Sequence, residues 1–107
     1  MTPIKITYQG TNFIENYCKK LRENIKKNYI PISNNTLGTV EFQIVVDRSG
    51  DILLMKQITS SGCEVLNDYA KLIIQESFPF EQFPDNILDS YLDMVALLGN
   101  DISIHAY

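Results

Sequence analysis

Few side chains of this chain could carry catalysis, and none of them stands beside a suitable partner. Ser60 and Ser61 are adjacent hydroxyls, but the only histidine, His105, lies two residues from the end of the sequence. A nucleophilic serine needs a base within hydrogen-bonding reach. Ser61 also stands where a helix cap is expected, which explains it without chemistry. We therefore predict no catalytic residue and no enzymatic activity.

Metal-binding chemistry is not indicated either. Asp85, Asp89 and Asp93 are carboxylates of one segment, yet their spacing does not match a calcium-binding loop. The sequence also has no histidine and cysteine cluster with the spacing of a zinc site. We predict that the protein has no metal and no cofactor.

The two cysteines, Cys18 and Cys63, fall on two different predicted helices. We expect two free, buried thiols. The alternative is a disulfide between Cys18 and Cys63, which would form in an oxidising compartment if the two Cα atoms come within about 7 Å.

The composition is that of one ordinary globular domain, spanning residues 1–107 with a core over about residues 12–98. The chain is 45% hydrophobic and 21% charged, with a net charge of −4, so we expect no nucleic-acid partner. No apolar run reaches the roughly 18–20 residues of a membrane span, and Met1-Thr2-Pro3 begins no signal peptide. We expect this segment itself to make no membrane contact.

The first amphipathic stretch predicts a helix over residues 12–28, with Asn12 as its cap, Glu15 as the capping-box partner and Pro31 after its end. A turn-forming loop, Ser33–Thr36, follows. The apolar side of the helix consists of Phe13, Ile14, Tyr17, Cys18, Leu21 and Ile25. Its other side is basic, with Lys19, Lys20, Arg22, Lys26 and Lys27. A solvated face is the favoured interpretation of these basic residues, and a docking patch is the alternative.

A hairpin comes next in the chain. The first strand has an apolar face of Val40, Phe42, Ile44 and Val46, and Asp47–Gly50 forms the turn. In the second strand, residues 51–59, we expect Ile52, Leu54 and Ile58 on one side. Lys56 breaks that alternation and predicts a bulge or a snorkelling lysine.

A second helix should begin at Ser61, with Glu64 completing a capping box, and should end before Pro79. Its predicted buried stripe is Val65, Leu66, Tyr69, Ala70, Ile73 and Ile74. The segment 80–89 reads as a loop, and Ser90–Leu98 as a third strand. After the Gly99-Asn100 turn, the last residues should either fray or add a short strand.

These elements predict an α+β fold of two layers with the topology α-β-β-α-β. We expect a three-stranded antiparallel sheet in the order 2-1-3, with both helices on its one apolar face. The third strand would then be a sheet edge with unpaired backbone groups, which a protein either protects or uses.

In this order of elements the chain resembles the C-terminal periplasmic domain of the TonB/TolA family of energy transducers, over roughly Phe13 to Leu98. The matching residues are Tyr17, Leu21, Ile25 and Pro31 in and after the leading helix, then Gly38, Phe42, Ile44 and Ser49-Gly50-Asp51-Ile52, then Ser60-Ser61-Gly62, Asp68, Ala70, Pro79-Phe80 and Phe83-Pro84. The TonB branch has a Tyr-Pro pair before its first strand, whereas this chain has Tyr29-Ile30-Pro31. The leading helix and the Phe-Pro-Phe region are closer to the TolA-like branch, so the branch stays open.

The resemblance implies a non-catalytic periplasmic domain cut from a parent chain with an inner-membrane span, a long stalk and a proton-driven motor complex. The domain would grip a TonB-dependent receptor or a Tol-Pal component by pairing with a strand edge. A free-standing periplasmic adaptor or inhibitor of the same fold is the alternative, and the oligomeric state stays open. The residues predicted to pair with the partner are Ser90, Tyr91, Leu92, Asp93, Met94, Val95, Ala96, Leu97 and Leu98.

Overall fold

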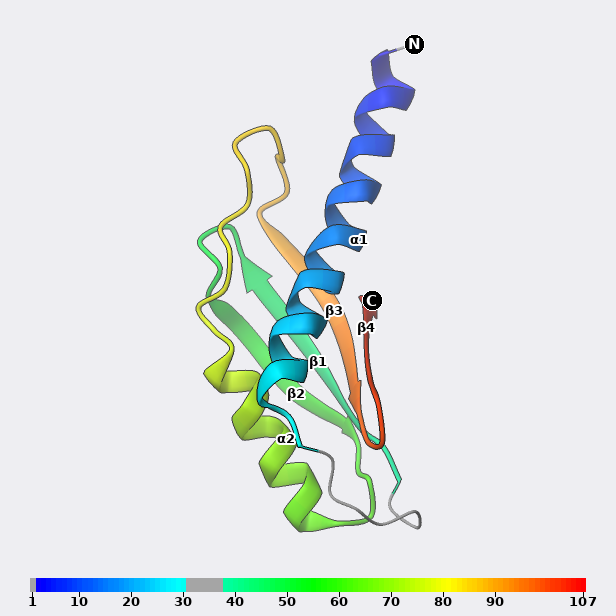
Figure 1. Cartoon of the computed structure of the whole chain (residues 1–107). Helices are drawn as coiled ribbons and strands as arrows, with labels where there is room; N and C mark the ends of the chain where they lie inside the picture. Colours follow the sequence, from blue (N-terminus) through cyan, green and yellow to red (C-terminus); the bar gives the residue numbers. More distant parts are fainter. Residues whose placement is uncertain (1, 31–37) are drawn as a thin grey trace.

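The computed structural model describes residues 2–30 and 38–107, so Pro31 and the predicted loop Ser33–Thr36 lie outside the described residues. The elements follow the predicted order, with one strand added at the end (Figure 1). They are α1 (Thr2–Asn28), β1 (Val40–Asp47), β2 (Ile52–Thr59), α2 (Glu64–Glu76), β3 (Tyr91–Leu98) and β4 (Ile102–Ala106).

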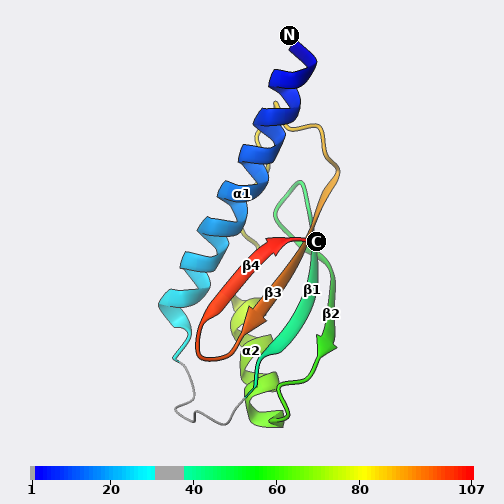
Figure 2. The same cartoon turned by 90° about the vertical axis from the view of Figure 1, so that its right-hand side faces the viewer.

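The sheet has four strands in the order β2-β1-β3-β4, and every neighbouring pair is antiparallel. The predicted α+β class and the order 2-1-3 are confirmed, but the prediction of only three strands is wrong. Figures 1 and 2 together place both helices on the same face of the sheet. Among residues 2–30 and 38–107, no helix lies on the opposite face.

The leading helix is longer than predicted. It begins at Thr2 instead of Asn12, and its N-terminal part projects beyond the sheet (Figure 1). Asn12 lies inside the helix, so the capping box of Asn12 and Glu15 is wrong. Pro3 sits in the first turn, where a missing backbone N–H leaves no helical hydrogen bond unmade. Gly10 only weakens a helix by about 1 kcal/mol, so the upstream residues do not stop it.

The core lies between the helices and the sheet. Its strand side chains are those predicted for β1, namely Val40, Phe42, Ile44 and Val46, and the alternate residues Leu92, Met94, Ala96 and Leu98 of β3. The helices contribute Tyr17, Cys18, Leu21, Ile25, Leu66, Ala70, Ile73 and Ile74. Predicted core residue Val65 is instead 68% exposed, because α2 turns that position away from the sheet.

Three side-chain hydrogen bonds to backbone carbonyls anchor α1, and the residue just after it, to other elements. The Tyr17 hydroxyl donates to the Glu81 carbonyl (3.1 Å), Arg22 Nε donates to the Ile102 carbonyl (2.7 Å), and the Tyr29 hydroxyl donates to the Gly99 carbonyl (2.6 Å). Each acceptor lies more than sixty residues along the chain from its donor. The long helix is therefore fixed to the loop before β3 and to both ends of the β3–β4 turn.

The start of α2 differs from the prediction. The residue before its first turn is Cys63, which makes no capping hydrogen bond through its side chain. Ser61 lies outside the helix, where its Oγ donates to Oδ1 of the buried Asn67 (2.7 Å) and accepts from the Cys63 N–H (3.1 Å). Ser61 thus holds the strand-to-helix loop in place instead of capping the helix.

Candidate functional site

The residues predicted to bind the partner form β3, and the structure places this strand inside the sheet. Ser90 is exposed just before the strand, and residues 91–98 pair along their whole length with β1. Residues 94–98 also pair with β4. The prediction that Ser90–Leu98 is an edge strand is therefore wrong, since β4 covers more than half of it.

Of the two possibilities predicted for the last residues, the short extra strand is the one found, as β4, and it has a signal in the sequence. Ile102 and Ile104 alternate with Ser103 and His105, and a turn-forming Gly99-Asn100 stands before them. In the structure, Ile102 and Ile104 are buried on the helix side of the sheet, while His105 is exposed. The segment is only five residues long, which is near the lower limit for a strand.

The outer edge of β4 offers backbone groups to a partner. The Tyr107 N–H donates to the Asp93 carbonyl (2.9 Å), and the hydrogen-bonded positions of an antiparallel ladder alternate. The backbone groups of Ile102, Ile104 and Ala106 therefore point away from β3. Those of Ile102 are occupied, by Arg22 and by the Asp101 carboxylate (2.8 Å). Ile104 and Ala106 remain, and together with Tyr91 of β3, beyond the end of β4, they form what we call the open edge.

The other edge of the sheet is β2, and it is irregular. Its register with β1 shifts twice, and Leu53 and Ile58 are the unpaired residues at these two bulges. Lys56 lies between them, exposed and regularly paired with Gln43, so the bulge predicted at Lys56 is found at Leu53 and at Ile58 instead. Leu54 was predicted on the same side of β2 as Ile52, but Leu54 is exposed whereas Ile52 is partly buried. Bulges and an edge lysine are devices that prevent a strand from pairing further.

A groove of about 330 Å³ lies between α1 and β4, next to the open edge. Its apolar residues are Ile14 and Cys18 from α1, and Ile104 and Ala106 from β4. Glu15, Lys19, Arg22 and His105 complete the lining. Burial raises the pKa of the Cys18 thiol to about 11, so this part of the groove lining is uncharged at neutral pH. Cys18 and Cys63 are free thiols, and no disulfide joins them; Cys18 is buried as predicted, whereas Cys63 is only partly buried.

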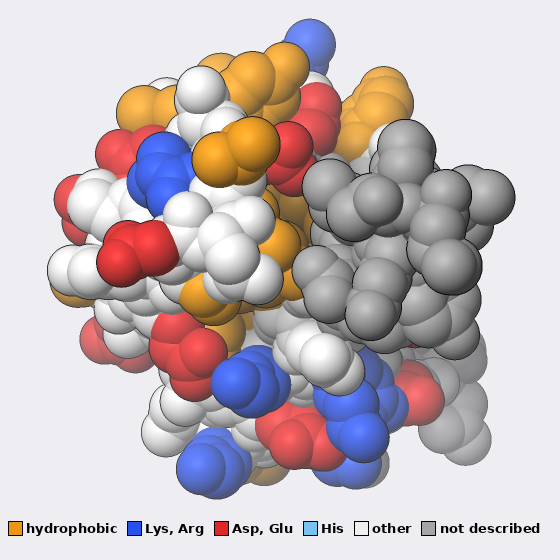
Figure 3. All heavy atoms as spheres, turned by 90° about the horizontal axis from the view of Figure 1, so that it is seen from above, with side chains coloured by type: hydrophobic (Ala, Val, Ile, Leu, Met, Phe, Trp, Pro, Cys, Tyr) orange, Lys and Arg blue, Asp and Glu red, His pale blue; other side chains and the backbone are white. Residues whose placement is uncertain are grey.

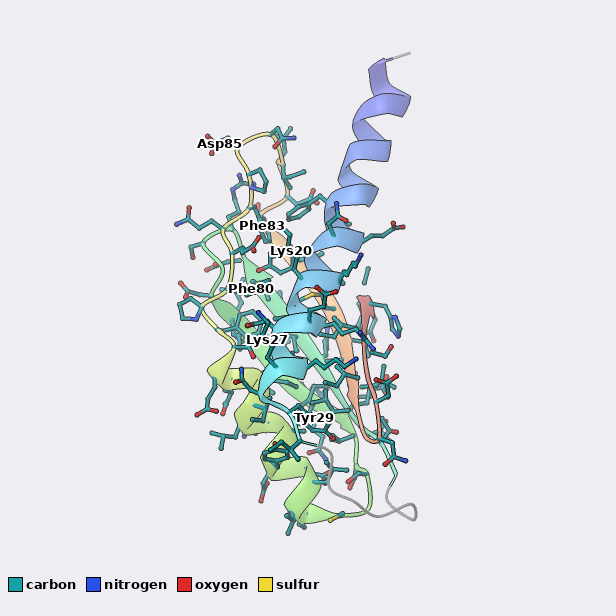
Figure 4. All side chains as sticks on the ribbon, in the orientation of Figure 1. Lys20, Lys27, Tyr29, Phe80, Phe83 and Asp85 are labelled. Atoms are coloured by element: carbon teal, nitrogen blue, oxygen red, sulfur yellow. The ribbon has the colours of Figure 1, made fainter. Side chains whose placement is uncertain are left out.

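A second groove, of similar size, lies between α1 and the loop before β3. Phe80 and Phe83 of this loop lie against the helix, whereas Asp85 lies near the loop's far end (Figure 4). The ring of Tyr17 makes edge contacts with both phenylalanines, at centroid distances of 5.3 and 5.6 Å. Lys20 and Glu81 form an exposed ion pair at its rim (3.3 Å). Three residues that line the second groove, Tyr17, Lys20 and Glu81, are thus engaged with neighbouring side chains.

One arginine fixes the loop before β3 to the hairpin. The guanidinium of Arg48 donates to the carbonyls of Ile87, Asp89 (2.8 Å) and Pro84 (3.4 Å), and it lies 5.9 Å from the centre of the Phe83 ring. The backbone adds two bonds, from the Phe83 N–H to the Arg48 carbonyl (2.9 Å) and from the Phe80 N–H to the Gly50 carbonyl (2.8 Å). Gly50 has a φ of +91°, and a Cβ there would lie 2.4 Å from the Phe80 carbonyl oxygen, so this contact requires glycine.

Basic side chains gather on the side of the molecule where α1 lies, with acidic side chains among them (Figure 3). Among Lys19, Lys20, Arg22, Lys26 and Lys27 of α1, Lys20 and Arg22 each form an ion pair, with Glu81 and Asp101. A solvated face stays the favoured interpretation of these basic residues, with a docking patch as the alternative.

Within residues 2–30 and 38–107, no group of three or more potential ligand side chains could hold a metal ion. No helix in the described part of the chain is long and apolar enough to cross a bilayer.

The model of the family described as TonB C terminal matches residues 14–95. No curated protein and no solved structure matches the chain.

Proposed function

We propose, because this chain belongs to the TonB C-terminal family, that it is the partner-binding domain of an energy transducer in a cell envelope. Domains of this family are periplasmic parts of membrane-anchored proteins. For this chain, the anchor, the coupling to a proton-driven motor and the grip on an outer-membrane or periplasmic partner are parts of the proposal. A TonB-dependent receptor and a Tol-Pal component are the two partners we consider. The proposed role is non-catalytic.

The observation that carries the proposal is the open edge. A partner segment that lies along β4 would find the outward N–H and C=O groups of Ile104 and Ala106, and could continue to Tyr91 beyond the end of β4. Pairing of this kind takes its affinity from the main chain. Each hydrogen bond adds only about 0.5–1.5 kcal/mol, so several must form together. The bulged β2 edge is the less suitable choice.

The predicted binding residues change accordingly. We retain Ser90 and Tyr91, where β3 extends beyond β4, and leave out Leu92, whose backbone groups face β1, and Asp93, whose carbonyl already accepts from the Tyr107 N–H. We add Ile104 and Ala106. Residues 94–98 already have strand neighbours on both sides, so their backbone could pair with a partner only if β4 left the sheet.

A nuclear magnetic resonance titration with peptides from TonB-dependent receptors and Tol-system components tests this proposal. We expect amide shifts to concentrate at Ile104, Ala106 and Tyr91. Shifts confined to the basic side of α1, at Lys19–Lys27, would contradict strand pairing and favour electrostatic docking.

Proline at position 106 gives a sharper test. The Ala106 N–H points away from β3, so Ala106→Pro removes a donor to the partner without breaking the β3–β4 ladder. We expect peptide binding to weaken by about two- to tenfold, the value of one hydrogen bond. Ala106→Ser keeps the donor and is the matched control. Equal affinities for the two variants would exclude this edge.

A further inference from the structure

The groove between α1 and β4 lies directly beside the open edge. Ile104 and Ala106 belong to both: their outward backbone groups form the edge, and their side chains line the groove. Ile104 is buried on the helix side of the sheet. The apolar layer between helix and sheet therefore continues to the border of the sheet, where Ile14 and Cys18 of α1 close it from the other side.

Strand geometry fixes which partner side chains would meet this groove. Successive side chains of a strand point to opposite faces of the sheet. In a strand added along β4, every second side chain would thus point to the helix side, next to Ile104 and Ala106 and toward Ile14. The groove has room at the lower end of the range for ligand sites, which suits a side chain better than a separate small molecule.

Charged side chains of α1 lie beside the groove, and they bear on which partner residues could lie next to it. Lys19 and Arg22 lie on its rim, and Glu15 is the one acidic residue there. Arg22 is occupied by the Ile102 carbonyl and the Asp101 carboxylate (3.3 Å). Lys19 forms no ion pair with any residue that the structure describes.

We propose that this groove receives one aliphatic side chain of the paired partner strand, and that Lys19 favours a carboxylate close to it. The inference rests on the proposed function and adds the chemistry of the partner. That partner is an extended protein segment in which an aliphatic residue faces the helix side and an acidic residue lies nearby. The neighbouring side chains of the segment point to the other face of the sheet, so this groove does not restrict their identity.

The probe is a library of random decapeptides displayed on phage, selected against the whole chain. Selected peptides are synthesised, and each aliphatic residue is replaced in turn by serine. We expect replacement at one position to weaken binding to the wild-type domain about tenfold, since it removes a buried aliphatic side chain.

The domain variants locate that side chain. Ile14→Ala should bind the aliphatic and serine peptides with affinities that differ less than about threefold, because the contact is already lost. Leu72→Ala removes an exposed aliphatic residue from α2 and should keep the full tenfold difference. Ile14→Val replaces Ile14→Ala if the alanine variant has a lowered melting temperature.

The charge is tested by Lys19→Glu, with Lys71→Glu on α2 as a control of equal charge change. We expect Lys19→Glu to slow association with an acidic peptide, and more so at low salt. Equal effects of the two variants would contradict the role of Lys19.

The remaining outcomes separate the inference from the proposed function. Suppose that peptides shift the Ile104 and Ala106 amides, but that Ile14→Ala keeps the tenfold affinity difference between the aliphatic and serine peptides. The groove assignment is then overturned, and strand pairing stands. If no selected peptide shifts these amides, strand pairing at this edge is overturned together with the groove.

Discussion

Cys18 is the residue whose environment most affects its chemistry. It is 5% exposed, lies on the side of α1 that faces β4, and contributes to the floor of the groove. Burial disfavours the thiolate and raises the pKa of the thiol from 9.0 to about 11. A thiol that stays protonated is a poor nucleophile, so its place in the groove suits packing and not reaction.

The raised pKa of Cys18 predicts a loss of stability in alkali. Above pH 9 the unfolded chain loses the thiol proton and the folded chain keeps it, so rising pH favours unfolding. The free energy of unfolding should fall by up to about 1.4 kcal/mol per pH unit between pH 9 and 11. Urea unfolding of wild type and Cys18→Ala at pH 8 and pH 10 measures it. The stability difference between them should shrink at pH 10, and an unchanged difference would refute the effect.

Among the elements, the loop between α2 and β3 depends on side chains from elsewhere. It has no regular structure from residue 78 to residue 90, yet Arg48 bonds three of its carbonyls and Phe83 is buried. The hairpin turn and the loop are thus held as one unit. This unit leads directly into Tyr91, which belongs to the open edge.

Arg48→Ala should loosen this loop. We expect the free energy of unfolding to fall by about 1–3 kcal/mol, because hydrogen bonds from a charged donor are lost. Hydrogen exchange at the Phe80 and Phe83 amides should become faster. Lys56→Ala, an exposed substitution on β2, should change stability by less than about 0.5 kcal/mol. Unchanged exchange at both loop amides would show that Arg48 does not hold the loop.

The elements also show how far sequence reasoning extends. The alternation of β1 predicted its buried face correctly because the burial of that face depends on a local pattern of period two. The start of α1 failed because Asn12 and Glu15 match a capping box, and nothing local shows that the helix continues upstream. The bulges at Leu53 and Ile58 depend on register with another strand, which no pattern within β2 encodes. The prediction that β3 is an edge strand was wrong for the same kind of reason. Whether β3 is internal depends on its pairing with β4, and no pattern within β3 encodes that pairing.

At the scale of the whole molecule, one core joins both helices to the sheet. Phe42 lies in the middle of β1, is 2% exposed, and has strands on both sides. Because all elements share this core, its loss should affect the entire domain. A domain of this size has a total stability of only about 5–15 kcal/mol.

Phe42→Ala should lower the free energy of unfolding by about 3–5 kcal/mol, through lost burial and the cavity left behind. Leu54→Ala, on the neighbouring strand but exposed, should cost less than about 0.5 kcal/mol. Denaturation with urea, followed by circular dichroism, measures both. An unchanged midpoint for Phe42→Ala would mean that β1 presents its other face to the helices.

The three hydrogen bonds that anchor α1 have a mechanical consequence. Their donors are Tyr17 and Arg22 within the helix and Tyr29 just after its end, and their acceptors lie in the loop before β3 and at the two ends of the β3–β4 turn. The helix acts as a stiff rod, so tension applied to its projecting N-terminal end would load the three attachments in shear and at the same time. Shared loading keeps any one of them from being peeled away before the others. A domain tied in this way should transmit a pull to the strand that carries the open edge, up to the force at which it yields as a unit.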